Sequence, residues 1–122
     1  MSEEPVVIAK LYDLILWTLP HLDKFPRNHK FTVGDRIEET LLDILELLIE
    51  AAYTKNKVMT LYEANIKLQK FRLMIRMSKD LKLISVKQYQ FASRHIEEIG
   101  KQIGGWRKQT IQEDEKNQKS LG

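Results

Sequence analysis

The chain of 122 residues contains no cysteine, which excludes a disulfide framework and any thiolate metal site. No run of apolar residues approaches the ~18 that a membrane span requires. The first five residues, Met1 to Pro5, are acidic and lack the basic beginning of a secretory signal. We therefore expect a cytoplasmic protein with no membrane contact.

The motifs of common enzyme classes are also missing. The sequence has no P-loop, no GxGxxG and no GxSxG motif. Its three histidines, His21, His29 and His95, are scattered without the HxxxH or ExxH spacing of a metal site. Adjacent acids on a helix point about 100° apart and do not converge on one substrate atom. We therefore predict a protein without catalytic residues, cofactor or metal.

Charge is distributed unevenly along the chain. Apolar residues make up 43% and charged residues 30%, as in a globular domain, and the net charge is only +3. Residues 1–50 carry 5 basic and 10 acidic side chains, whereas residues 51–111 carry 13 basic and 4 acidic ones. Such asymmetry indicates a polyanionic partner or an acidic surface on another copy of the chain.

The sequence predicts four helices. A helix after Pro5 should end near Leu19, before a non-helical linker from Pro20 to Phe31. Three capping boxes should begin the next helices, which we expect over about 33–55, 61–82 and 86–109; the boxes are Thr32–Asp35, Thr60–Glu63 and Ser85–Gln88. Short connections make neighbours antiparallel. The expected fold is an all-α, up-down four-helix bundle over 1–111, followed by a disordered polar tail over 112–122.

Apolar residues at spacings of 3 and 4 define the seams that should form the core. The seams comprise Val7, Ile8, Leu11, Ile15 and Leu22; Ile37, Leu41, Ile44, Leu48 and Ala51; Leu61, Ala64, Leu68, Phe71, Ile75 and Ser78; and Tyr89, Ala92, Ile96, Ile99, Ile103 and Trp106. Other apolar residues lie off these seams, namely Leu16, Trp17, Leu42, Ile49 and Tyr53. These five are predicted to form contacts between copies of the chain.

Basic residues follow two helices of the second half. Arg72, Arg76 and Lys79 lie beside the third seam, and the fourth helix carries a basic row at intervals of 7, namely Lys87, Arg94, Lys101 and Lys108. One hypothesis is that these cations bind a polyanion. An alternative is that the row meets an acidic stripe on the second helix of a neighbouring copy, which runs from Glu39 to Glu50.

Several segments resemble one bacterial four-helix-bundle family. It includes the accessory variability determinant (Avd) proteins of diversity-generating retroelements and the ribosomal-RNA intervening-sequence proteins. The resemblance is carried by Phe25-Pro-Arg-Asn-His-Lys-Phe-Thr-Val-Gly-Asp-Arg36, Phe71-Arg-Leu-Met-Ile-Arg76, Asp80-Leu-Lys82, Gln88-Tyr89, Glu98-Ile-Gly100 and Gly104-Gly-Trp106. The extended Phe-Pro-Arg linker and the Gly-Gly-Trp ending are closer to the Avd branch.

The resemblance implies a homopentameric ring without a catalytic site. Avd proteins associate with the retroelement's reverse transcriptase and bind nucleic acid, and so support mutagenic copying of template RNA into cDNA. Arg72 and Arg76 match basic positions of the family on the third helix. The alternative within the family is ribosomal-RNA binding by an intervening-sequence type of protein. The basic row on the fourth helix follows from charge alone.

Overall fold

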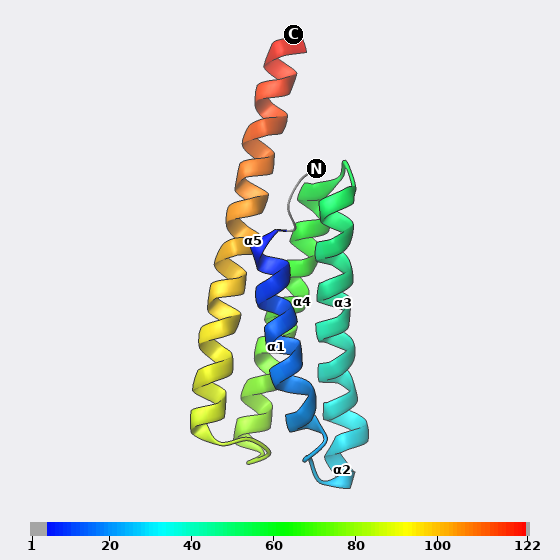
Figure 1. The fold of residues 1–122 in the computed structure, drawn as a ribbon, viewed down its shortest axis with the longest axis vertical. Helices are drawn as coiled ribbons and strands as arrows, with labels where there is room; N and C mark the ends of the chain where they lie inside the picture. The colour runs from blue at the N-terminus through cyan, green and yellow to red at the C-terminus, as the bar shows by residue number, and fades with distance from the viewer. Residues whose placement is uncertain (1–4, 122) are drawn as a thin grey trace.

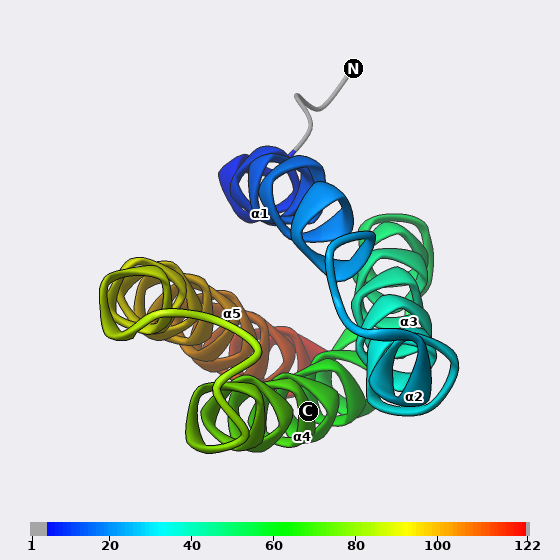
Figure 2. The same ribbon diagram turned by 90° about the horizontal axis from the view of Figure 1, so that it is seen from below.

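The computed structural model describes residues 5–121, and all of its regular structure is helical. Four long helices run alternately down and up the molecule (Figure 1): α1 (Val6–Leu22), α3 (Asp35–Tyr53), α4 (Lys57–Asp80) and α5 (Val86–Leu121). Viewed along the bundle, α4 lies opposite α1, and α3 and α5 occupy the other two corners (Figure 2). Each helix is therefore antiparallel to both of its neighbours, and the predicted up-down bundle is confirmed.

The core forms as the helical periodicity predicts. Every predicted seam residue of the first three helices is buried, and in α5 Ala92, Ile96, Ile99 and Ile103 are buried with Tyr89 and Trp106 packed at the edge. One core residue of α1, Leu14, is additional to the predicted seam. A single cluster of buried apolar side chains joins all four helices, which positions their outer faces relative to one another.

The linker between the first two long helices is more helical than the sequence predicts. α1 continues through Pro20 to Leu22, because a proline near the end of a helix removes only one backbone hydrogen bond. The chain then turns, buries Phe25 in the core, and forms a short helix α2 (Arg27–His29) and a π-helical turn η1 (Lys30–Gly34) that leads into α3. The predicted non-helical linker is thus reduced to a few residues around Phe25.

Only one of the three predicted capping boxes forms. The Ser85 hydroxyl accepts from the backbone N–H of Gln88 at 3.1 Å, and the Gln88 side chain accepts from the N–H of Ser85 at 2.8 Å. In contrast, the Thr32 hydroxyl donates to the carbonyls of Asn28 and His29. The Thr60 hydroxyl donates to the carbonyl of Asn56, inside a helix that has already begun at Lys57. These two predictions are wrong because both threonines lie within helical turns, where a hydroxyl bonds to the carbonyl four residues earlier.

The turn between α4 and α5 holds these two basic helices together. Lys82 adopts a left-handed conformation with φ of 62°, and the N–H of Leu83 donates to the carbonyl of Ser78 at 2.8 Å. This arrangement closes the end of α4 as a Schellman motif, with lysine in the position that glycine usually occupies. The chain reverses direction within five residues, so α4 and α5 pack side by side.

The chain after residue 111 differs from the expected tail. α5 does not end near residue 109 but runs on to Leu121, and its last turns project beyond the bundle (Figure 1). Polar residues such as Glu113 and Lys116 suit an exposed helix as well as a disordered segment, so composition did not distinguish the two. Residues 1–4 and 122 lie outside the described part of the chain.

Candidate nucleic-acid interface

The charge asymmetry of the sequence becomes a division between two sides of the bundle. The basic segment 51–111 forms α4, the following turn and most of α5, whereas the acidic segment 1–50 forms α1, α2 and most of α3. Because α4 and α5 are neighbours (Figure 2), the two helices of the basic segment form one side of the molecule. A side of this kind attracts polyanions over a distance of about the Debye length.

The predicted α4 residues lie on the flank of α4 that faces α5. Arg72 and Arg76 are exposed, and Lys79 is half-buried with its Nζ 4.4 Å from the centre of the Tyr89 ring on α5. Asp80 partly neutralises this group, since its carboxylate lies 3.5 Å from Lys79 Nζ and 4.0 Å from Arg76 Nε. Arg72 has no acid within 4.0 Å among residues 5–121, so its charge is fully available.

The predicted α5 residues form one exposed row. Lys87, Arg94, Lys101 and Lys108 are all exposed, and a spacing of seven residues rotates each by only about 20° from the one before. Within the described chain, the only acid paired with this row is Glu97, 3.5 Å from Lys101 in the same helix. The row lies on the outer face of α5, roughly opposite its buried seam, and only Lys108 lines a groove between α5 and α4. Their contact with nucleic acid stays a prediction.

Four of the five predicted subunit-contact residues gather on one side of the bundle. The Asp43 carboxylate pairs with Lys67 of α4 at 2.8 Å, which marks the α4 side of α3. Leu42 and Ile49 lie about 100–120° around α3 from Asp43, on the side of α1. All of the following apolar residues are at least 40% exposed there, and we call them the α1–α3 apolar face: Tyr12, Leu16, Leu42, Ile49 and Tyr53.

The fifth residue, Trp17, lies on the opposite flank of α1 and packs within the chain. Its ring stacks on Phe91 of α5, with ring centres 4.8 Å apart, and also contacts His21 at 4.2 Å. Phe91 in turn contacts His95 at 4.3 Å. Four rings therefore join α1 to α5. The prediction that Trp17 lies off the seam is confirmed. Its partner Phe91 could not be predicted, because it lies on a helix far away in the sequence.

A second exposed apolar surface was missed. Met59 and Met77 are both exposed on the outer side of α4. With Ile66 and Leu73, also exposed, they follow spacings of 7, 7 and 4 along one line of the helix. We call these four residues the α4 apolar face. The regular spacing of these apolar residues in the sequence could have predicted this surface, but charged residues of α4 lie between them.

An ion pair fixes α1 against α5 near the middle of the bundle. Lys10 Nζ lies 2.6 Å from a carboxylate oxygen of Glu98. The hydrogen bond from Lys10 and its positive charge lower the pKa of Glu98 below its usual 4.5. The Glu98 carboxylate is thus paired with Lys10 on the α1 side of α5. It does not form an ion pair with the basic row on the outer face of the helix.

Residues 5–121 contain no group of three or more His, Asp or Glu side chains placed to hold a metal ion. His21 and His95 each place Nδ1 against the backbone carbonyl four residues earlier, at 2.6 and 2.9 Å. None of the described helices has the length and apolar character needed to cross a membrane.

Fold and surface together define the protein as an all-α helical bundle with one basic side and two exposed apolar faces. The chain belongs to the bAvd-like family, whose model matches residues 5–110. This match confirms the Avd resemblance noted in the sequence. No curated protein matches the chain.

Proposed function

We propose that this protein is the non-catalytic accessory subunit of a diversity-generating retroelement. In this role it binds the template RNA or its cDNA and associates with the reverse transcriptase, which performs the mutagenic copying. Membership of the bAvd-like family supports the accessory role. The observation that supports nucleic-acid binding most strongly is the cationic surface shared by α4 and α5.

Phosphate contacts from this surface are independent of base sequence. Lysine and arginine bind phosphate oxygens and release condensed counterions, so such contacts hold a nucleic acid without reading its bases. Arg72, with no acid beside it, and the row from Lys87 to Lys108 supply contacts along about 30 Å of α5. An accessory protein that assists copying of varied templates needs this kind of binding.

Self-association multiplies such contacts. The α1–α3 apolar face and the α4 apolar face are different surfaces on different sides of one chain. Contact between two different surfaces generates a ring when the rotation closes, and the family resemblance favours a pentamer. Several copies would hold one nucleic acid with a higher effective concentration of cations than a single chain.

The alternative pairing of acidic and basic stripes would contribute less to assembly than the apolar faces. Asp43, in the middle of the acidic stripe of α3, is already paired with Lys67 in its own chain. Exposed ion pairs contribute little, about 0–1 kcal/mol each. The apolar faces are the stronger source of association energy, and the basic row stays free for phosphate.

The proposal is tested by reconstituting copying with the retroelement's reverse transcriptase and template RNA. We expect cDNA yield to fall when this protein is omitted, and to fall similarly with the double variant Arg72→Ala/Arg76→Ala. The matched control Lys55→Ala/Lys70→Ala removes two exposed cations that belong neither to the flank of α4 facing α5 nor to the basic row, and it should retain the yield. An undiminished yield without the protein would refute the proposed role.

A further inference from the structure

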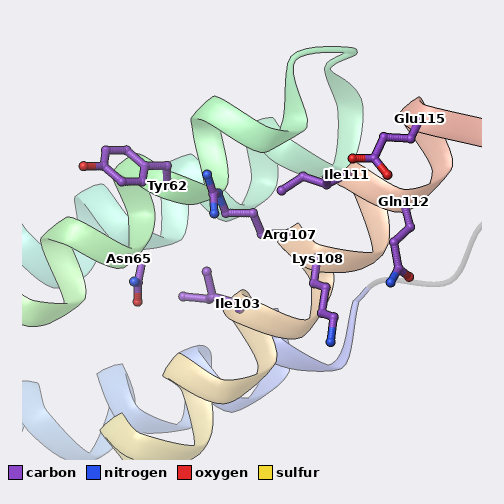
Figure 3. A pocket seen from close by; sticks show the side chains of 9 residues that line it. Tyr62, Asn65, Ile103, Arg107, Lys108, Ile111, Gln112 and Glu115 are labelled. Atoms are coloured by element: carbon purple, nitrogen blue, oxygen red, sulfur yellow. The ribbon is translucent and has the colours of Figure 1, made fainter. Parts of the chain in front are cut away.

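A groove lies beside the upper end of the basic row, between the first half of α4 and the last half of α5. Figure 3 shows the side chains that line it, and its volume is about 550 Å³. α5 supplies Ile103, Arg107 and Ile111 at intervals of four, which is one line along the helix. α4 supplies Tyr62 and Asn65 on the facing wall. Neither Tyr62 nor Arg107 belongs to the sites considered so far.

The backbone of α5 is open to close approach at this groove. Gly104 lines it, and a Cβ added there would meet nothing within 4 Å. Glycine inside a helix costs about 0.5–1 kcal/mol relative to alanine. No neighbour within the described chain requires a glycine here, and the missing side chain leaves the α5 backbone exposed in the groove.

Arg107 lies in this groove with its charge uncompensated. Its guanidinium carbon is 5.5 Å from the centre of the Tyr62 ring, which makes a cation–π pair. Its Nε is buried and has no hydrogen-bond partner, the single such side-chain atom in the described chain. No carboxylate of residues 5–121 lies within 4.0 Å of it. The Tyr62 ring is therefore the only partner that the described chain gives this guanidinium among the contacts above.

These groups match the chemistry of one nucleotide. A tyrosine ring and a guanidinium plane offer stacking surfaces to a base of any sequence. The side-chain amide of Asn65, one turn along α4 from Tyr62, offers a donor and an acceptor to its edge. Lys108 lines the groove and is also the last member of the basic row, so a phosphate chain that follows the row arrives at this point. Glu115, at the far edge, repels phosphate and keeps the backbone on the Lys108 side.

We infer that this groove takes an unstacked base of a single-stranded nucleic acid, placed against the Tyr62–Arg107 pair. The inference rests on the proposed function and adds to it the form of nucleic acid bound. A base held in a duplex is paired and stacked and does not enter a groove between two helices. The phosphate contacts would then hold either form, whereas the groove favours single strands.

The test compares a labelled single-stranded oligonucleotide with a duplex of the same length, using Tyr62→Leu and Arg107→Lys. Leucine keeps apolar bulk, and lysine keeps the charge while removing the guanidinium plane. Each variant should weaken single-strand binding about fivefold or more and leave duplex binding unchanged. Tyr62→Phe, which retains the ring, should bind as the original protein does.

Arg27→Lys is the matched control, since it makes the same change at an exposed arginine of α2, away from α4 and α5, and should alter neither affinity. Unchanged single-strand binding in both groove variants, or an equal loss for single strands and duplex, would overturn the inference. If the groove variants instead lose binding of a peptide that carries a carboxylate, and keep their oligonucleotide binding, the groove binds a protein. That result would also overturn the inference. If Arg72→Ala/Arg76→Ala weakens both forms while the groove variants do not, the proposed function stands and only this inference fails.

Discussion

The amine of Lys10 on α1 lies 2.6 Å from a carboxylate oxygen of Glu98 on α5, which ties the first helix of the bundle to the last. The pKa of Glu98 is lowered in the folded state, because the Lys10 hydrogen bond and charge favour the carboxylate. Its contribution to stability is therefore present above pH 4.5 and is lost as the pH falls through the lower, folded-state pKa.

We expect Glu98→Gln to lower the melting temperature at pH 7, and this effect should shrink as the pH falls through the folded-state pKa of Glu98, because the carboxyl then becomes protonated in both states. Lys10→Met should produce the same loss, and the double variant should lose no more than either single one. Thermal unfolding followed by circular dichroism measures all three. Additive losses would show that the two residues act independently.

Trp17 should stabilise the individual chain. Trp17→Ala removes the ring that stacks on Phe91, and we expect a loss of about 2 kcal/mol in the free energy of unfolding, since the side chain is only half-buried. Leu16→Ala, at the neighbouring position on the exposed flank, should change it by less than about 0.5 kcal/mol. Urea denaturation of a monomeric background measures both. Similar values for the two variants would contradict the importance of the stack.

The capping box at the start of α5 should contribute more to the free energy of unfolding than the Thr32 hydroxyl in the linker. Ser85→Ala removes the acceptor for the N–H of Gln88 and should cost about 1 kcal/mol. Thr32→Ala removes two long, exposed bonds to helical carbonyls and should cost less than about 0.5 kcal/mol. Chemical denaturation of both variants compares them, and the opposite order would show that Thr32 caps a helix after all.

The sequence predicts those parts of the fold that are determined by interactions between residues close together in the chain. The buried seams, including Ile37, Leu41 and Leu68, follow from a period of 3.6 residues and were predicted correctly. The first two capping boxes failed because the Thr–x–x–acid pattern is the same whether the threonine precedes a helix or lies within one. The choice is made by the tertiary structure, since buried Phe25 sets the path of the linker before α3.

Features formed by residues of two different helices could not be predicted from the sequence. The Trp17–Phe91 stack and the Tyr62–Arg107 pair each join residues far apart in the chain, and no periodicity links them. The basic row on α5 was predictable because all of its members lie on one helix. The groove at its upper end was not, because α4 supplies the facing wall.

The two apolar faces should join different surfaces of neighbouring subunits. Ile49→Glu alters the α1–α3 apolar face and Leu73→Glu the α4 apolar face, and each should leave the chain folded but monomeric. Each variant retains the face that the other lacks, so an equal mixture should form a heterodimer with one intact contact. Analytical ultracentrifugation measures the masses.

Val86→Glu is the control for this experiment, since Val86 is exposed at the start of α5, outside both faces, and its change should leave assembly intact. A mixture of Ile49→Glu and Leu73→Glu that stays entirely monomeric would rule out this pairing of faces.

Nucleic-acid binding by the α4–α5 surface is tested most directly by the dependence of affinity on salt. For single-stranded RNA, the logarithm of the binding constant should fall linearly with the logarithm of salt concentration, with a slope of about −0.7 for each phosphate contact. Arg72→Ala/Arg76→Ala should make that slope shallower by about 1.4 while assembly and helicity are unchanged, and Lys55→Ala/Lys70→Ala should leave it as it was. A slope that is the same in the original protein and in the Arg72/Arg76 variant would contradict the assignment of this surface to phosphate binding.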